Sequence, residues 1–464
     1  MGKSFSTPNL VYRLEHGTVT DKEIAAEYLC TKVKRYSDHP EYIQAVGKYA
    51  TKLLVDLAKK GNDKGKQYAA ATLSYLALNP DNKVLIMEEG ALPVLIELAK
   101  SGTLEQKGAA AVAFANLGNR NAGNQKKIIQ AGAVPLLIKM VKESKDGHHQ
   151  VRSWAASALG NLCSQSPENQ EKLGAAGAID ALLELLAAKM PAFTEKNQED
   201  GLLTKAHDAV TCRRRKNEPP KGPTMAESAA RNLNMLLYSH KLNQERLLKA
   251  NGLVALLKLV KEGKPKEEVE ALRTVQNVWG PIGAEVANAK LVEAGGIDTL
   301  VEVSRSHHLE AKEAAVGLVA RLIASKVDYK PQIVEAGAIG ALCKLFESGS
   351  PQARIWTTRA ISILADASND YRAKVVESGG SAVLELAGAS LMRIKQADES
   401  EAEAAKAAAE EAFKAAAEEA KAAEEAKAAA DEEAKEKQEE EKQAEGKQED
   451  SEARQRKAGG GQVD

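Results

Sequence analysis

The chain of 464 residues has few aromatic side chains, few cysteines and no long apolar run. Aromatics make up 4% of the residues against 44% hydrophobic residues overall, so aliphatic side chains must fill the core, as between closely packed helices. Four cysteines lie far apart and form no CxxC pair, which is typical of reduced thiols in a cytoplasmic or nuclear protein. No apolar stretch approaches the roughly 18–20 residues that cross a bilayer, so we expect no transmembrane helix.

The chain also lacks the residue patterns of catalysis. Its eight histidines form neither HExxH nor a zinc-binding Cys/His spacing, and no P-loop, GxSxG elbow or kinase signature occurs. The sequence therefore predicts a protein that is not an enzyme, with no catalytic residue, no metal ligand and no cofactor. We expect no nucleic acid among its partners.

What the chain has instead is a repeat, in which a glycine step followed by an apolar run returns at nearly constant spacing. Successive anchors lie 43, 42, 45, 75, 43, 42 and 42 residues apart. The anchors are Gly47, Gly90, Gly132, Gly177, Gly252, Gly295, Gly337 and Gly379. A fixed period in the low forties indicates one supersecondary unit repeated, in which each copy buries its apolar face against its neighbours.

Residues 124–163 show how one copy reads. A short first helix carries Ile128 and ends at Gly132, and Pro135 suits the first turn of a second, apolar helix. After a polar loop, residues 151–163 repeat apolar side chains every three or four residues. Each copy is thus expected to contain three helices.

The copies begin with asparagine, turn through sequences such as EAGAI and close the third helix with LxNL. This pattern resembles the armadillo repeat over roughly residues 42–395. HEAT repeats have a similar length but lack the Gly-Ala turn, so they fit less well. The resemblance implies an all-α fold, a right-handed armadillo-repeat superhelix (α-solenoid) of about eight repeats that serves as a protein-interaction scaffold.

In armadillo proteins the third helices line a concave groove, and the resemblance carries this role onto matched residues here. The position before the last apolar residue of the third helix reads Tyr75, Asn116, Asn161, Met235, Asn277, Arg321 and Ile363 in seven of the copies. An asparagine side chain can pair with the main chain of an extended peptide, as a neighbouring strand would. Trp154 and Trp356, two turns earlier, are either exposed anchors for partner side chains or rings packed between repeats.

Arginines mark the second half of this predicted groove. Arg231, Arg273 and Arg359 lie one turn before the position that Arg321 occupies. Guanidinium groups favour acidic or phosphorylated partner segments, although each could equally pair with an acid of an adjacent repeat. They would repel the basic peptides that importin-α binds. The chain is therefore more similar to armadillo scaffolds such as β-catenin or the vacuole-associated proteins than to a nuclear transport receptor, which stays an alternative.

Charge and composition divide the rest of the chain. Residues 398–464 carry 22 Asp and Glu against 11 Lys and Arg, so the body of residues 1–397 is net basic. We predict an N-terminal segment at 1–41, the repeats at 42–397 with an inserted loop at 188–223, a charged, coiled-coil-like Ala/Glu/Lys helix at 398–445 and a disordered tail at 446–464. The helix has no apolar heptad seam, and we expect a monomer.

The first residues, Met1-Gly2-Lys3-Ser4-Phe5-Ser6, match the N-myristoylation pattern with Gly2 as acceptor. One acyl chain gives marginal membrane binding, and no cysteine for a second anchor stands nearby. A cytoplasmic protein is the expectation. Peripheral membrane contact through Gly2, which would make the chain a lipoprotein and a membrane tether, and a nuclear location are the alternatives.

Overall fold

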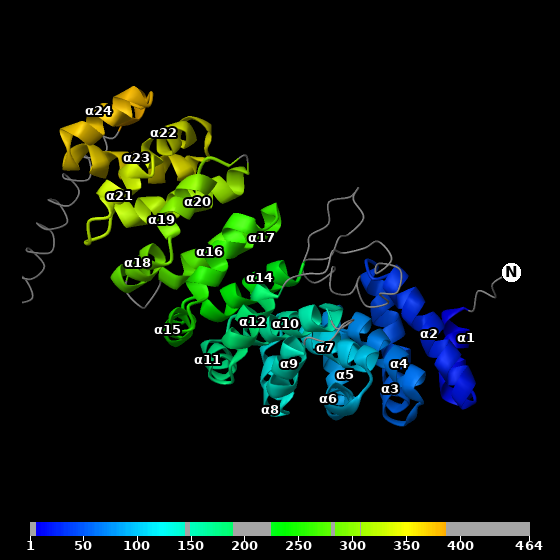
Figure 1. The fold of residues 1–464 in the computed structure, drawn as a ribbon. Coiled ribbons are helices and arrows are strands. Elements are labelled where there is room, and N and C mark those ends of the chain that lie inside the picture. The colour runs from blue at the N-terminus through cyan, green and yellow to red at the C-terminus, as the bar shows by residue number, and fades with distance from the viewer. Residues whose placement is uncertain (1–5, 144–148, 189–223, 280–283, 307, 387–464) are drawn as a thin grey trace, which may run out of the picture. The chain divides into compact units, whose positions relative to one another are not determined.

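The computed structural model describes residues 6–143, 149–188, 224–279, 284–306 and 308–386. All regular elements in these ranges are helices, and residues 1–385 form one compact unit. Figure 1 shows the helices following one another in layers from α1 to α24. The predicted all-α solenoid is confirmed for this part of the chain. The predictions for Gly2, for most of the insert at 188–223, and for the helix and tail at 398–464 concern residues outside these ranges.

One set of helices forms the spine of the solenoid, because each member packs on the next one along the chain. We call them the third helices: α2 (Val19–Arg35), α4 (Asp63–Leu76), α7 (Leu104–Gly118), α10 (His149–Cys163), α14 (Met225–Leu237), α17 (Pro265–Gln276), α20 (Leu309–Ile323) and α23 (Pro351–Ala367). A short 3-10 turn, η2 (Asn277–Trp279), continues α17.

Two shorter helices complete most repeats. The second helices, which pack against the third, are α6 (Ala91–Ser101), α9 (Ala133–Lys142), α12 (Ala178–Ala187), α16 (Gly252–Glu262), α19 (Gly296–Val303) and α22 (Ala338–Ser348). The first helices are α5 (Pro80–Glu88), α8 (Ala122–Gln130), α11 (Pro167–Ala175), α15 (Lys241–Lys249), α18 (Ala284–Glu293), α21 (Lys330–Glu335) and α24 (Asn369–Glu377).

Local sequence explains where these helices begin. Several third helices start after a side chain that caps the free backbone N–H groups, such as Thr103, whose hydroxyl accepts from the N–H of Gln106. The turn between first and second helices needs a left-handed residue. Glycine supplies it at 90, 132, 177, 295, 337 and 379, with φ between 76° and 90°. In the fourth of these turns, between α15 and α16, Asn251 takes this conformation, one residue before the predicted Gly252.

The start of the chain differs from the sequence-based division. Residues 1–41 were expected to precede the repeats, yet α1 (Thr7–His16) and α2 pack on each other, and α2 packs on α4 as α4 packs on α7. Leu10, Leu14 and Leu29 are buried in this contact. The repeat-like packing therefore begins at Thr7.

Gly47, the first predicted turn, is not a turn. It lies inside α3 (Pro40–Lys60), a continuous helix that replaces the separate first and second helices of the other repeats. A Cβ atom at Gly47 would collide with the side-chain amide of Asn82. The glycine is needed here because α5 approaches α3 closely, and not for its backbone freedom.

Buried amides of the first helices join consecutive repeats. Asn82, Asn124, Asn169 and Asn243 each donate from Nδ2 to the carbonyl of a residue near the end of the preceding third helix, at 2.9–3.2 Å. The side chain of the next residue, a glutamine in three of these helices, bonds carbonyls at or just beyond the ends of neighbouring third helices: Gln125 donates to three carbonyls, and Gln170 and Gln244 donate to two each. We call each such pair an amide dyad. Buried carbonyls that would otherwise lack partners are thereby satisfied.

Candidate functional site

The predicted groove residues lie on the third helices, and hydrogen bonds set the register between these helices. Asn116 Nδ2 donates to the carbonyl of Ser74 on α4 at 2.7 Å, and Asn161 Nδ2 donates to that of Ala115 on α7 at 3.0 Å. Asn277 bonds the side chain of Asn234 on α14. Equivalent residues of neighbouring third helices therefore stand side by side. We call the stripe that they form the third-helix face.

These bonds also show that the asparagine amides are engaged within the chain. Asn116 is 1% exposed and Asn161 is 9% exposed, and their Nδ2 groups hold the preceding helix. Tyr75, at the same position of α4, has no exposed surface at all. A partner backbone would have to displace an internal bond before Asn116 could donate to it. In the first repeats this stripe consequently resembles a core seam.

The two tryptophans differ in exposure. Trp154 is 6% exposed, and its ring lies against Gly108 of α7, so packing between repeats, one of the two predicted alternatives, is what the structure shows for it. Trp356 lies in the same way against Gly317 of α20 but is half-buried. A Cβ at Gly108 would come within 2.7 Å of the Trp154 ring, so something would have to shift there, whereas a Cβ at Gly317 would make a tight contact of 3.1 Å with the Trp356 ring. Of the two rings, Trp356 alone keeps a sizeable face toward solvent.

The central arginines are paired with acids. Arg231 Nη2 lies 2.6 Å from Glu227 Oε1 and 3.4 Å from Glu270 Oε1. Arg273 lies 3.3 Å from Glu270 Oε1 and also pairs with Glu310 of α20. Glu227 and Glu270 are buried, so these ion pairs offset the cost of burying their charges. The alternative in which arginines pair with neighbouring repeats therefore holds for Arg231 and Arg273.

The two C-terminal arginines are different. Arg321 at the end of α20 and Arg359 in α23 are both exposed, and neither forms an ion pair or hydrogen bond with any residue in the described ranges. Partial desolvation lowers the pKa of the Arg321 guanidinium from its usual value, and no carboxylate nearby compensates. Arginine stays charged at neutral pH nonetheless. Two cations thus remain available at this end of the third-helix face.

Another buried carboxyl group lies in the central region. Glu268 of α17 is buried, and burial raises the pKa of its carboxyl group above its ordinary value while His308 opposes the rise. Glu267 accepts a hydrogen bond from the hydroxyl of Thr224 at 2.5 Å. The centre of the third-helix face therefore combines buried acids with the two paired arginines.

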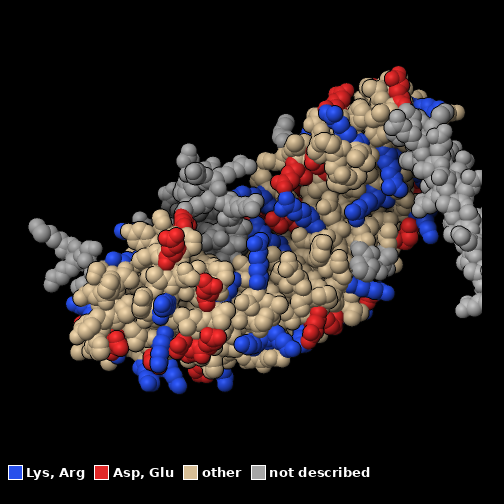
Figure 2. Space-filling model, turned by 180° about the vertical axis from the view of Figure 1, so that it is seen from behind, with Lys and Arg blue, Asp and Glu red and all other residues tan. Residues whose placement is uncertain are grey.

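Figure 2 shows basic and acidic side chains interspersed on a described surface that is largely formed by other residues. This interspersed pattern fits the many ion pairs between neighbouring helices, such as Lys142 with Glu184 and Arg246 with Glu171. Exposed pairs of this kind contribute at most about 1 kcal/mol each. Whether an arginine is free to bind a ligand therefore depends on whether a neighbouring carboxylate already pairs with it.

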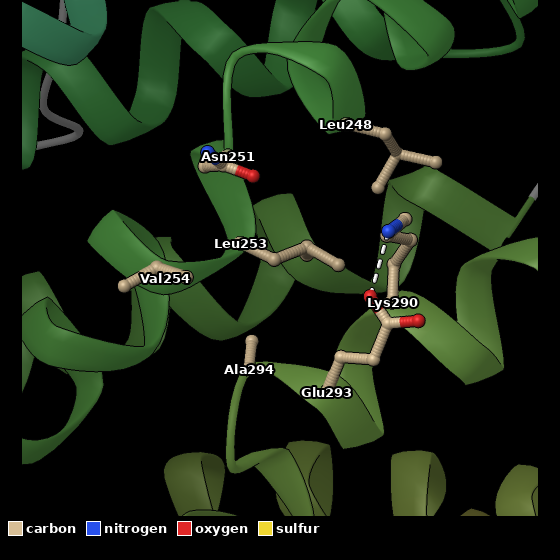
Figure 3. A pocket seen from close by; sticks show the side chains of 7 residues that line it. All are labelled: Leu248, Asn251, Leu253, Val254, Lys290, Glu293 and Ala294. Atoms are coloured by element: carbon tan, nitrogen blue, oxygen red, sulfur yellow. Dashed lines mark hydrogen bonds and ion pairs between the residues drawn. The ribbon is translucent and has the colours of Figure 1, made fainter.

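A small pocket opens beside the turn between α15 and α16 (Figure 3). Its volume is about 140 Å³, and Lys290 Nζ and Glu293 Oε2 of α18 form a 2.6 Å ion pair at its edge. Small-molecule sites usually enclose about 300–1,000 Å³. The lining residues are Leu248, Asn251, Leu253, Val254, Lys290, Glu293 and Ala294. The pocket is too small for a typical ligand site.

A search of the described residues found no cluster of His, Cys, Asp and Glu suited to a metal ion. In the same ranges no helix is both long and apolar enough to cross a membrane. The three cysteines that the structure describes are buried, and burial raises the pKa of Cys30 and Cys163 to about 12. Thiols with such high pKa values are poor nucleophiles.

Sequence reasoning missed the amide dyads as a structural device. Their signal was present, because Asn-Gln recurs at 124, 169 and 243, each time eight residues before the left-handed turn residue. The sequence-based prediction instead assigned the asparagines of the third helices to partner binding. Both sets of amides turn out to bond carbonyls of neighbouring helices.

Comparison with known proteins agrees with this architecture. Residues 79–118 and 121–164 match the family model described as Armadillo/beta-catenin-like repeat. Over 96 residues the chain is 34% identical to Armadillo repeat-containing protein 3 of Homo sapiens, which covers 21% of this chain and 11% of that protein. The matching stretch is thus about a tenth of that relative's length.

One solved structure shows the same fold. An engineered protein covers 82% of this chain and 93% of its own, with 23% identity and a TM-score of 0.54. A designed armadillo repeat protein covers 59% and 99% respectively, with 21% identity and a TM-score of 0.47. Residues 79–118 and 121–164 thus match the armadillo repeat, and the described residues have the all-α solenoid fold of such repeats.

Proposed function

We propose that this chain is a protein-interaction scaffold that binds extended segments of partner proteins along the third-helix face. Armadillo repeats generally bind proteins and typically lack enzymatic activity, which supports this class of function. The observation that carries the proposal is the register between third helices, in which Asn116 bonds α4 and Asn161 bonds α7. Matched positions at regular intervals suit a ligand whose own residues repeat at regular intervals.

The same register favours the C-terminal half as the binding part. The matched positions Asn277, Arg321 and Ile363 have accessible surface there, whereas Tyr75 and Asn116 are buried. Main-chain recognition by Asn116 or Asn161 would require their present bonds to open. Side-chain recognition near Trp356 requires no such change.

Two narrower roles are less well supported. An importin-α-like receptor binds basic segments, and the unpaired charges of Arg321 and Arg359 oppose such ligands. A membrane tether depends on acylation of Gly2, which lies outside the described residues. Close kinship with β-catenin or the vacuole-associated scaffolds, a monomeric state and a cytoplasmic location likewise remain proposals.

Site-specific photo-crosslinking tests the scaffold function in the full chain. The photoreactive residue p-benzoylphenylalanine replaces Ile363 on α23 or Met235 on α14, both partly exposed on the third-helix face, and replaces Val84 on α5 as control. Val84 is 50% exposed but lies on a first helix. We expect partner adducts from 363 and 235 but not from 84, and cross-linked peptides that come from one linear stretch of each partner. Equal adduct formation from position 84 would contradict the proposal.

A further inference from the structure

Four arginines occupy the third-helix face between α14 and α23, and the structure separates them into two pairs. Arg231 and Arg273 are held by Glu227, Glu270 and Glu310. Arg321 and Arg359 are exposed and have no acidic partner in the described ranges. Among the described arginines of the third-helix face, those with unpaired guanidinium groups therefore lie on α20 and α23.

The contacts between α20 and α23 bring these two arginines to within about one turn of each other along the helix axes, although Arg359 stands one turn before the position that matches Arg321. Glu313 of α20 accepts a 2.7 Å hydrogen bond from the N–H of Ser350, and Gly317 lies under the ring of Trp356. Since both residue numbers rise together, the helices run in parallel. Arg321 follows Gly317 by four residues and Arg359 follows Trp356 by three, so each lies about one turn beyond this contact.

This arrangement suits one anion. Neighbouring helices pack with axes roughly 8–10 Å apart, and arginine side chains are long enough to converge across that distance. Guanidinium forks bind carboxylate and phosphate oxygens in pairs. The solvent-facing part of the Trp356 ring lies one turn away and offers an apolar contact for the neighbouring residue of an extended chain.

We propose that Arg321 and Arg359 form an anion subsite for a carboxylate or phosphate side chain of an extended partner segment, with Trp356 contacting the adjacent residue. This inference rests on the proposed scaffold function and deepens it, because it assigns acidic or phosphorylated ligands to the last two third helices. Arg231 and Arg273 lie on the same face but are paired with acids, so they do not compete for the anion. Partners would thus be anchored at the C-terminal repeats.

The test measures fluorescence anisotropy of labelled, unstructured peptides with the full chain. One peptide alternates Glu with Ser, a second carries phosphoserine in place of Glu, and a third carries Lys. The variant Arg321→Ala/Arg359→Ala removes the subsite. Arg354→Ala/Arg372→Ala removes the same charge from exposed positions of α23 and α24 and serves as the matched control. Circular dichroism verifies that both variants fold.

We expect the wild-type chain to bind the Glu or the phosphoserine peptide and not the Lys peptide. The subsite variant should lose about tenfold or more in affinity, because it removes the charge-assisted hydrogen bonds to the anion, while the control changes little. The peptide that binds better shows whether the preferred anion is a carboxylate or a phosphate. Trp356→Ala should weaken either peptide less than the double arginine variant does.

Three results would overturn the subsite. Equal losses in the subsite variant and the control would indicate a general charge effect, and binding of neither anionic peptide would remove the ligand class. Arginine-dependent binding to phosphatidylserine vesicles without peptide binding would assign the cations to a membrane. In each case the photo-crosslinks from position 363 still report separately on the scaffold function.

Discussion

The repeats built around α5, α8, α11 and α15 differ from those built around α18, α21 and α24 in how they are joined. The earlier group carries an amide dyad, with Lys83 taking the place of glutamine in α5 and donating to the carbonyl of Asn119 at 2.5 Å. At the same positions the later repeats have Ala287–Asn288, Tyr329–Lys330 and Tyr371–Arg372. The paired positions of the dyad are thus kept in the first group and lost in the second, whose repeats are joined by other bonds, such as that from the N–H of Ser350 to Glu313.

The third-helix face follows the same division. In α7 and α10 no residue from Gly108 to Gly118 or from Val151 to Cys163 is exposed. In α20 and α23, Arg321 and Arg359 reach solvent, and Trp356 is partly exposed. One region satisfies its polar groups internally, while the other leaves charged and aromatic groups available. A solenoid can therefore separate stability from recognition along its length, because each repeat contacts mainly its neighbours.

The largest expected effect concerns the tryptophans. Trp154→Ala should destabilise the region of α7 and α10 by about 3–5 kcal/mol, because it removes a buried ring and leaves a cavity beside Gly108. Trp356→Ala should cost less, since this residue is partly exposed. Hydrogen exchange of the amides in α10 and α23 compares the two local losses. Similar losses would show that the C-terminal region is as tightly packed as the central one.

A smaller effect is expected at an amide dyad. Asn243 is fully buried and donates to the carbonyls of Gln170 and Leu236 at 2.8 and 2.9 Å. Asn243→Ala leaves both carbonyls without this donor and should cost about 2–3 kcal/mol in hydrogen-exchange stability around α11 and α15. The exposed amide of Gln332 in α21 provides the control, where Gln332→Ala should change stability by less than about 0.5 kcal/mol. Equal effects would mean that the dyad does not join the repeats.

The smallest pair of effects has opposite signs. A Cβ at Gly174 of α11 would collide with the amide of Asn243, so Gly174→Ala should destabilise by about 1–3 kcal/mol. At Gly340 of α22 nothing lies within 4 Å of the added atom, so Gly340→Ala should stabilise its helix by about 0.5–1 kcal/mol. Urea denaturation of the two full-length variants checks the signs. A stabilising Gly174→Ala would show that the close approach between α11 and α15 is looser than described.

Much of the architecture could be predicted because it depends on local rules. The third helix expected at 151–163 is found as α10 from His149 to Cys163, and six predicted glycine turns have the left-handed conformation. The first repeat escaped prediction, because α1 and α2 contain no such turn and Gly47 sits within a helix. The pattern of a left-handed turn does not distinguish a glycine required for its φ from one required for close packing.

The candidate site was less accessible to sequence reasoning. The matched positions identified the helices that carry these residues. The sequence did not show which of the four arginines are paired with acids or which of the two tryptophans is buried. Whether a guanidinium is free depends on acids elsewhere in the chain, such as Glu310, which lies 37 residues after Arg273. Exposure of a ring depends on the packing of the neighbouring helices and not on its place in the repeat.

By itself, then, the sequence determined the period, the all-α class and the helices that carry the matched residues, because spacing, caps and turn residues act over a few positions. The tertiary structure decided which amides are engaged, which ring is buried and which arginines are paired. Those outcomes depend on side chains that are about one repeat apart in the chain and come within hydrogen-bonding distance only when the repeats stack.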